Sequence, residues 1–385
     1  MIVREFVGLL LKRLNERRAP LQVVLGPRQV GKTFGVEKHL IPKLSGHVHY
    51  ATADEALTPS VRWIEEQWQH ALEKGKGTTL IIDEIQCIEN WSKTVKVLWD
   101  RQKDADVPPL KCVLLGSSSL SLQKGLSESL TGRFEEVRVP HWGFLETQKA
   151  FGWKLPTFLT FGGYPGSYDF INDYARWFSF LKNSVIETVI GKDILNQNRV
   201  SKPALFRQAF EILCHYPAQE VSYNKLLGQL QDKGNVDLVK HYLQLYEGAF
   251  LFRSLHKYAK RGIAARTSSP KIIPLCPAIS TLALGRTPTP ELQGRMFEAA
   301  VGSQLIGVPS SRLYYWREGR DEVDYILESE GRVFSIEVKS SKRELRAGAT
   351  QFRKKFRGSR SIVIHPKNFE EFCSDSLNFL EKCSV

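Results

Sequence analysis

The sequence predicts an α/β protein that begins with a parallel sheet, continues through a helical and winged-helix segment, and ends in a second α/β domain. Three observations lead to this prediction. A glycine-rich loop follows the apolar run at 21–25, and paired acids at 83 and 84 follow a second apolar run. An alternating hairpin with further acids covers 322–339. Short apolar runs of this kind are typical of strands buried in a sheet.

Residues 26–33 read GPRQVGKT and match G-x-x-x-x-G-K-[ST], the loop that binds nucleotide phosphates. The two glycines let backbone amides turn toward the phosphates, and a helix that starts at the loop's end adds a partial positive charge. Lys32 would reach the β- and γ-phosphates, and Thr33 would offer a hydroxyl to Mg²⁺. The residues expected around ATP are Gly26, Pro27, Arg28, Gln29, Val30, Gly31, Lys32, Thr33 and Phe34.

A second predicted strand, 78–82, ends in Asp83 and Glu84. Ligands bind at the carboxyl ends of strands in open α/β sheets, so both acids are expected beside the loop. Asp83 would hold Mg²⁺ directly or through water, and Glu84 would orient and deprotonate the attacking water. A third strand, 111–116, precedes Ser118, which we expect near the γ-phosphate or that water. Together these motifs predict Mg²⁺-dependent ATP hydrolysis.

Three further segments complete a pattern: LTGRF at 130–134, PHWGFLE at 140–146 and FGGYPG at 161–166. With them the chain resembles the bacterial and archaeal AAA-type ATPases that carry a winged-helix segment and a C-terminal domain of unknown function. The resemblance implies that Arg133 is an arginine finger acting on a neighbouring subunit's nucleotide. It also implies a homo-oligomer, with the hexameric ring usual for AAA-type ATPases. The alternative is that Arg133 is an ordinary surface arginine.

Composition agrees with two or three globular domains in 385 residues. No stretch approaches the roughly 20 apolar residues that span a bilayer, and the N-terminus lacks the pattern of a signal peptide. We therefore expect a cytoplasmic protein without a membrane partner. No C-x-x-C pair occurs among the cysteines, so we expect reduced thiols and neither a zinc site nor a disulfide framework. The cysteines are at 87, 112, 214, 276, 373 and 383.

The net charge of +13 suggests DNA or RNA, an acidic partner or a membrane surface as the binding partner. Between 339 and 360 there are nine lysines or arginines and one acid. Helical spacing at 206–216, a cap at Ser222 and a third helix at 236–247 capped by Asn235 predict a winged helix-turn-helix closed by a strand at 249–255. Its third helix would present Lys240, His241 and Gln244 to a major groove. The alternative is a segment that packs between domains or proteins.

The hairpin pairs an alternating strand at 322–328 with a second strand at 332–339, around a turn at 330 and 331. Its period of two places Glu337 and Lys339 on one face, with Asp324 on the adjacent strand. This set resembles the active site of restriction-endonuclease-like nucleases, where the acids bind a divalent metal and the lysine positions water. A helical Glu298 would complete the site, with Gln351 nearby. The alternative is an inactive fold in which Glu337 and Lys339 form an ordinary ion pair.

We therefore expect an ATPase core in 1–150, a helical lid or linker in 151–202, a winged helix in 203–265 and a nuclease-like domain in 266–385. The predicted function is ATP hydrolysis coupled to DNA binding or processing, with ATP and Mg²⁺ as cofactors and a second divalent metal at the nuclease-like site. The alternative is a signalling or remodelling ATPase whose partner is a protein and whose nuclease-like domain is inactive.

Overall fold

The computed structural model divides the chain into two compact units. Unit 1 contains Met1–Pro140 and Val185–Arg199, and unit 2 contains His141–Ser184 and Val200–Val385. The chain thus enters unit 2, returns to unit 1 and enters unit 2 again. The structure describes residues 2–16, 19–56, 58–102, 110–117, 126, 129–196, 200–231, 234–259, 268–284, 288–339 and 347–384.

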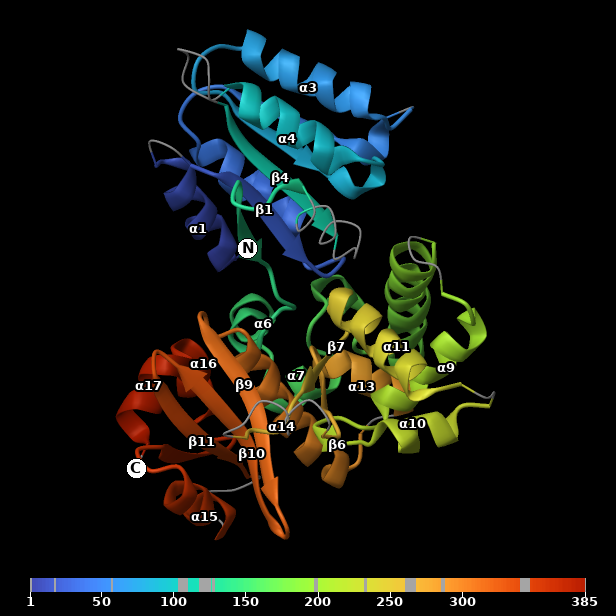
Figure 1. The fold of residues 1–385 in the computed structure, drawn as a ribbon, viewed down its shortest axis with the longest axis vertical. Helices are drawn as coiled ribbons and strands as arrows, with labels where there is room; N and C mark the ends of the chain where they lie inside the picture. Colours follow the sequence, from blue (N-terminus) through green and yellow to red (C-terminus); the bar gives the residue numbers. More distant parts are fainter. Residues whose placement is uncertain are drawn as a thin grey trace. The chain divides into compact units, whose positions relative to one another are not determined.

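Unit 1 contains a parallel sheet, which confirms the predicted α/β class. Its strand order is β2-β3-β4-β1-β5, so strands that are neighbours in the chain are separated in the sheet. The central strands β1, β3 and β4 are almost entirely buried, because helices cover both faces of the sheet (Figure 1). The strands are β1 (Leu21–Gly26), β2 (Val48–Thr52), β3 (Thr79–Asp83), β4 (Lys111–Ser117) and β5 (Phe134–Arg138).

Helix α1 precedes the first strand of unit 1, and further helices connect β1, β2, β3 and β4, as expected for parallel strands. The helix after β1 begins as α2 (Lys32–Gly35) and continues as a π-helical turn, Val36–Leu40, and a 3₁₀ turn, Ile41–Lys43. The later segment of the unit contributes a second π-helical stretch, Val189–Leu195. The remaining helices are α1 (Glu5–Leu14), α3 (Val61–Glu73) and α4 (Trp91–Arg101), with 3₁₀ turns at Ala53–Glu55 and Ile85–Cys87.

Unit 2 begins with short helices that share an apolar core with its C-terminal sheet. Phe144 and Phe158 belong to one buried cluster with Phe297, Phe334 and Phe369. Gly163 adopts φ +120°, and a Cβ there would lie 2.4 Å from Cys276 Cβ, so this tight approach requires glycine. The elements are α6 (Phe144–Phe151), α7 (Leu155–Phe161), a 3₁₀ stretch Pro165–Phe170, α8 (Tyr174–Ser179), a π-helical stretch Phe180–Ile186 and α13 (Pro277–Leu284).

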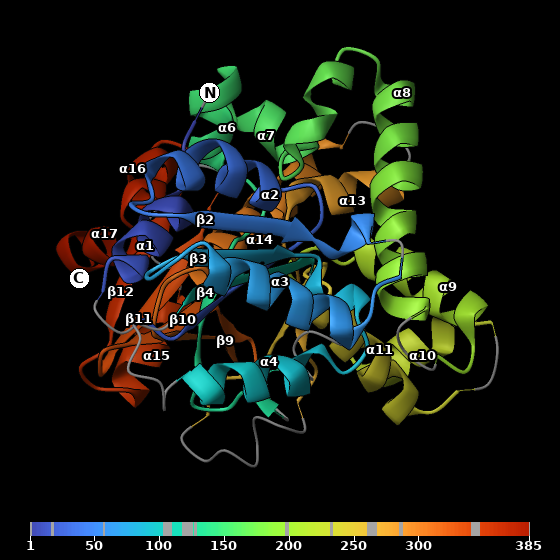
Figure 2. The ribbon, with the colours of Figure 1, turned by 90° about the horizontal axis from the view of Figure 1, so that it is seen from above.

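Three helices and a small antiparallel sheet form the winged-helix part of unit 2, and the helices gather together in Figure 2. The predicted caps are confirmed: Ser222 Oγ accepts from Lys225 N, and Asn235 Oδ1 accepts from Leu238 N at 2.8 Å. The small sheet, in the order β6-β8-β7, extends past residue 265. The elements are α9 (Pro203–Cys214), β6 (Gln219–Glu220), α10 (Tyr223–Gln229), α11 (Val236–Gly248), β7 (Phe252–Leu255) and β8 (Lys271–Pro274).

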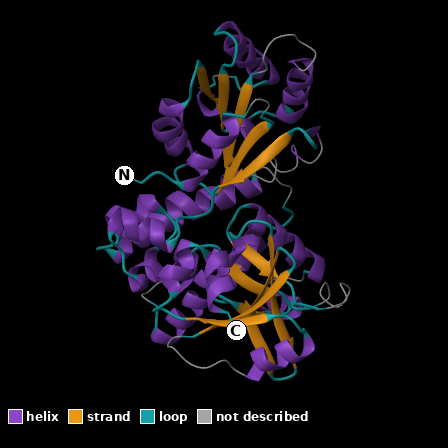
Figure 3. Ribbon diagram, turned by 90° about the vertical axis from the view of Figure 1, so that its left-hand side faces the viewer, coloured by secondary structure: helices purple, strands orange, loops and turns teal. Residues whose placement is uncertain are grey.

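The C-terminal part of unit 2 is a mixed sheet in the order β12-β11-β10-β9, with helices packed against it (Figure 3). The predicted hairpin is confirmed: β10 and β11 are antiparallel, and Glu330 and Gly331 form the turn with φ values of 50° and 77°. Strand β12 then pairs parallel to β11. The elements are α14 (Pro290–Ile306), β9 (Ser311–Glu318), β10 (Asp321–Ser329), β11 (Arg332–Val338), α15 (Ala347–Lys355), β12 (Arg360–Ile364), α16 (Phe369–Ser374) and α17 (Ser376–Cys383).

The fold also bears on membrane-spanning helices and on the state of the cysteines. Within the described ranges, no helix is both long enough and apolar enough to cross a membrane. The six cysteines are free, as the scattered spacing predicts.

Candidate functional site

The phosphate-loop sequence forms a tight turn between β1 and α2. Gly26 is the last residue of β1 and packs against the segment that follows β5. An added Cβ on Gly26 would lie 2.2 Å from the carbonyl oxygen of Val139. Gly31 stands immediately before α2 with φ +82°, a conformation that glycine adopts without strain. Gln29 also adopts a positive φ of 57°. This succession of left-handed and right-handed residues curls the backbone and forms a concave loop at the start of a helix, where amides attract anions.

Lys32 lies inside the loop. Its ammonium donates to the carbonyl oxygens of Gly26 at 2.9 Å and Pro27 at 2.7 Å. The side chain is only 7% exposed, and burial lowers the pKa of Lys32 to about 8, although the carboxylates of Glu84 and Asp83 oppose that shift. A buried ammonium gains from a nearby anion, because the anion offsets the lost hydration. Lys32 is therefore placed and charged to receive a phosphate.

The predicted metal residues Thr33 and Asp83 meet at the carboxyl end of the sheet. Thr33 Oγ1 donates to Asp83 Oδ2 at 2.5 Å, although the two residues come from different strand–loop connections. Tyr50, in the middle of β2, donates its hydroxyl to the same carboxylate oxygen at 3.3 Å. Burial, and then the charge of Asp83, raise the pKa of Tyr50 above its usual range, so the phenol remains a donor. The sequence analysis did not identify this tyrosine.

Glu84 follows Asp83 in a left-handed conformation, with φ 50° and ψ 37°. Its backbone N–H donates to Asp83 Oδ1 at 2.8 Å, and its carboxylate accepts from the side chain of Gln86. The turn separates the neighbouring carboxylates: Asp83 binds the loop hydroxyl while Glu84 is held by Gln86. Burial raises the pKa of Glu84, and the cations of Arg28 and Lys32 oppose this shift. A raised pKa suits a group that must accept a proton.

Arg28 belongs to the loop, but its side chain is paired within the protein. Its guanidinium makes two 2.7 Å contacts with the carboxylate of Asp193, which is 1% exposed. The hydrogen bond to Asp193 raises the pKa of Arg28. Arg28 therefore serves the expected site by fixing the loop, and its guanidinium is not directed at a phosphate. Asp193 was missed, although an acid within the apolar sequence 189–195 was a signal for a buried ion pair.

Arg133 lies at the end of the sheet where β1 and β5 begin, whereas the phosphate loop lies at the end where β1 terminates. It directly precedes β5, and its neighbour Phe134 pairs with Leu21, the first residue of β1, whereas Gly26 is the last. The guanidinium of Arg133 makes a bidentate contact with Asp100 of α4, at 2.8–3.1 Å. Any contact of Arg133 with a nucleotide would therefore involve a second copy of the chain. Ser118, which we expected near the γ-phosphate or the attacking water, lies outside the described residues.

At the C-terminal sheet, three predicted nuclease residues, Asp324, Glu337 and Lys339, are held by contacts within the protein. Asp324 lies at a bulge in β10, and its Oδ2 accepts from the backbone N–H of Val338 at 2.7 Å. Lys339 Nζ lies 2.7 Å from Glu337 Oε2, and both side chains are buried. The predicted shared face of β11 is confirmed, and it contains an ion pair.

Lys271 of β8, a residue that the sequence analysis did not consider, binds the fourth member of the set. Its ammonium lies 2.5 Å from Glu298 Oε1 and donates to the carbonyl oxygen of Asp324 at 3.0 Å. Burial raises the pKa of Glu298 to about 7, although Lys271 opposes that shift. In the described part of the chain, no three His, Cys, Asp or Glu side chains form a group that could hold a metal. The expected second divalent metal is therefore not supported, and Gln351 is exposed on α15.

The predicted recognition helix is α11. Lys240, His241 and Gln244 are exposed on it, as expected. Lys240 pairs with Asp237 one turn earlier, at 3.4 Å. The described part of this face therefore has little net positive charge.

Family models match three consecutive parts of the chain. Residues 18–148 match the model described as AAA domain. Residues 152–289 and 293–381 match two models described as domains of unknown function, DUF8612 and DUF4143. An AAA domain in 18–148 agrees with the phosphate loop and the parallel sheet of unit 1.

Two relatives found by sequence have the description uncharacterized protein. One from Mycobacterium tuberculosis is 28% identical over 334 residues, covering 84% of this chain and 70% of the relative. One from Methanocaldococcus jannaschii is 23% identical over 359 residues, covering 85% of this chain and 77% of the relative.

Solved structures give a partial likeness. The RuvB Holliday junction branch migration motor of Thermotoga maritima is 16% identical with a TM-score of 0.33, covering 65% of this chain and 89% of that one. The Orc1 protein of Aeropyrum pernix, solved in complex with DNA, is 11% identical with a TM-score of 0.31. The match covers 72% of this chain and 91% of the Orc1 chain. The family comparison thus assigns an AAA domain to residues 18–148, followed by two domains whose function is undescribed.

Proposed function

We propose that unit 1 hydrolyses ATP with Mg²⁺. The contact between Thr33 and Asp83 is the main support, because it brings the loop hydroxyl and the strand-end carboxylate to one point. A hydroxyl and a carboxylate at that position are the ligands that Mg²⁺ uses in phosphate-loop enzymes. The buried ammonium of Lys32 fits the phosphates of the same nucleotide. The residues present therefore fit Mg²⁺ and ATP together.

Each residue has a separate task in this proposal. Thr33 and Asp83 hold the metal, which when bound neutralises charge on the phosphates, and Lys32 adds a positive charge beside them. Glu84 orients the attacking water and accepts its proton, and its raised pKa favours that transfer. Arg133 would complete the site from a second copy, because it lies at the far edge of its own sheet. This requires a homo-oligomer, and we propose a ring of the AAA type acting in the cytoplasm.

Unit 2 would couple this cycle to a partner, for which two classes remain. We favour DNA, because the net charge is +13 and a winged-helix arrangement precedes the C-terminal sheet. The alternative is a protein partner, which the paired Lys240 on α11 favours. We propose that the nuclease-like sheet binds without cutting, because Lys271 and Lys339 pair with Glu298 and Glu337, two of the carboxylates that a metal would need.

The first prediction separates nucleotide binding from hydrolysis. Glu84→Gln should retain ATP binding and lose roughly 10²- to 10⁴-fold in turnover, because only proton transfer is removed. Lys32→Ala should lose binding itself. Turnover in Mg²⁺ and binding of a fluorescent ATP analogue measure the two effects, with exposed Glu89→Gln as the matched control. Full turnover in Glu84→Gln would show that another group activates the water.

The second prediction concerns pH. The ammonium form of Lys32 binds phosphate, and its pKa in the free loop is about 8, so raising the pH through 8 removes the proton that binding requires. ATP affinity should therefore be about tenfold weaker at pH 9 than at pH 7. Lys32→Arg is the control, because arginine keeps its charge and its affinity should not change over this range. Equal pH dependence in the two proteins would contradict the role of Lys32.

The third prediction tests the partner class. Duplex DNA should raise steady-state ATP turnover several-fold at low salt, and the stimulation should fade as salt increases, because phosphate contacts release counterions. Lys32→Ala provides the blank. Unchanged turnover, with basal hydrolysis intact, would favour the protein-partner alternative.

The fourth prediction tests the ion pair between Lys271 of β8 and Glu298 of α14. Lys271→Met removes the charge at similar length and leaves Glu298 unpaired, so it should lower the free energy of unfolding by about 3–5 kcal/mol. The double variant Lys271→Met/Glu298→Gln should recover part of that loss, because the buried charge is gone. Urea unfolding measures both variants. Full stability of Lys271→Met would mean that the pair has no structural role.

A further inference from the structure

Helix α15 is anchored to the C-terminal sheet by one face. Ala349 and Phe352 are buried in a cluster with Trp316, Val323 and Ile326, and Phe356 packs against its edge. Gly348 approaches β10 so closely that a Cβ would lie 2.0 Å from the carbonyl oxygen of Glu322. The position of the helix is therefore fixed by packing, and its outward face is presented on a rigid support.

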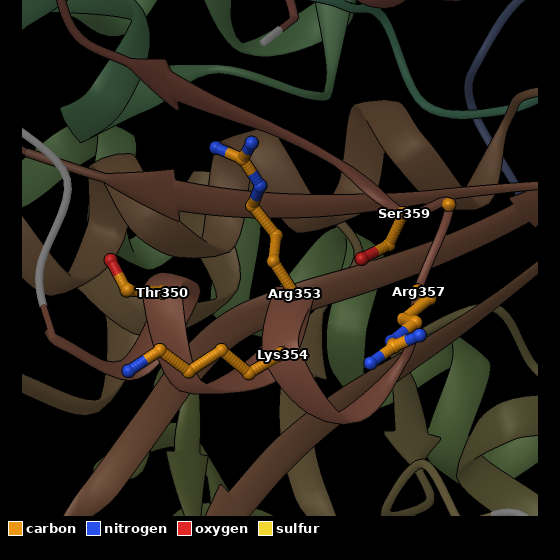
Figure 4. A pocket seen from close by; sticks show the side chains of 6 residues that line it. Thr350, Arg353, Lys354, Arg357 and Ser359 are labelled. Atoms are coloured by element: carbon orange, nitrogen blue, oxygen red, sulfur yellow. The ribbon is translucent and has the colours of Figure 1, made fainter.

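The outward face is cationic, as Figure 4 shows. Thr350, Arg353 and Lys354 occur at the i, i+3, i+4 spacing of one face of α15, Arg357 follows in the turn after the helix, and all four are exposed. With Gly358 and Ser359 they line an open cavity of about 730 Å³, and none of its described lining residues is acidic. We call the five side chains Thr350, Arg353, Lys354, Arg357 and Ser359 the α15 cationic face.

The three cations of this face differ from the neighbouring Lys355 in their ion pairing. Among the described residues, Arg353, Lys354 and Arg357 form no ion pair, whereas the adjacent Lys355 lies 2.5 Å from Glu318 Oε2. Arg353, Lys354 and Lys355 all lie in the last turn of α15, where cations interact favourably with the helix dipole. Arg353, Lys354 and Arg357 are nevertheless like charges close together, and an anionic ligand would relieve their repulsion.

We propose that the α15 cationic face binds the sugar-phosphate backbone of duplex DNA. Guanidinium, ammonium and hydroxyl groups are the donors that proteins use for phosphates. The face has no aromatic side chain on which an unpaired base could stack, since Phe352 and Phe356 point into the core, and this favours a duplex over a single strand. Contacts of this kind position a duplex without reading its sequence. The inference rests on the proposed coupling to DNA and supplies its contact surface.

The test is binding of a fluorescent duplex by the full chain, measured by anisotropy at several salt concentrations. The triple variant Arg353→Gln/Lys354→Gln/Arg357→Gln should bind at least roughly tenfold more weakly at 0.1 M salt. The slope of log affinity against log salt should fall by about 2 to 3, close to 0.9 for each lost phosphate contact. Unrelated duplex sequences should show the same loss.

Two controls isolate the site. Lys38→Gln/Lys43→Gln/Lys76→Gln removes three exposed charges from unit 1 and should leave the affinity within about twofold of the wild type. Arg353→Lys/Arg357→Lys keeps the charge and should retain most binding. Thermal melting of the triple variant shows that α15 is still folded.

The outcomes separate this site from the broader proposal. A wild type that does not bind the duplex overturns both this site and the coupling to DNA. A wild type that binds, together with a triple variant of equal affinity and salt slope, overturns this site alone. Equal losses in the α15 and unit 1 triple variants would assign the effect to net charge and also overturn it.

Discussion

The nucleotide site depends on the parallel register shared by β1, β4 and β3. Strand β4 lies between the other two, pairing Leu25 with Gly116 on one side and Ile82 with Leu114 on the other. All three strands therefore end at the same edge of the sheet, where residues far apart in sequence can share one ligand. The short contact between Thr33 and Asp83 is a consequence of this register. A slip of one residue in either pairing would reverse which side chains face each other.

A second constraint acts on the loop from outside the sheet. Arg28 and Lys32 are both cations of the loop, but Asp193 holds Arg28, which leaves Lys32 as the loop cation for a phosphate. A carboxylate buried as fully as Asp193 needs such a partner, because an unpaired buried charge is costly. Since Asp193 follows the return of the chain from unit 2, the loop conformation is tied to the segment beginning at Val185. Nucleotide binding and the conformation of that segment are therefore physically linked.

Sequence patterns predicted the structural features that depend on residues close together in the chain. The phosphate loop, the strand before Asp83, the caps of α10 and α11 and the hairpin turn depend on adjacent residues, and the structure has each of them. Asp193, Tyr50 and Lys271 were missed, because each acts through a contact with a distant strand or loop. The hairpin that carries Asp324 and Glu337 was predicted, whereas the role of the nuclease-like set stays a prediction. The pairing of its carboxylates with lysines depends on where β8 lies, which their own spacing does not encode.

The charges of unit 2 are distributed in a way that distinguishes binding from cleavage. Beside the C-terminal sheet, Lys271 of β8 neutralises Glu298 of α14, and at the end of β11 Lys339 neutralises Glu337; Lys271, Lys339 and Glu337 are buried. Outside the same sheet, Arg353, Lys354 and Arg357 remain in water without an acidic neighbour in the cavity they line. A metal-dependent nuclease needs the reverse arrangement, with free carboxylates at its centre. A domain that holds a polyanion on its surface needs the arrangement seen here, since long-range attraction acts through exposed cations.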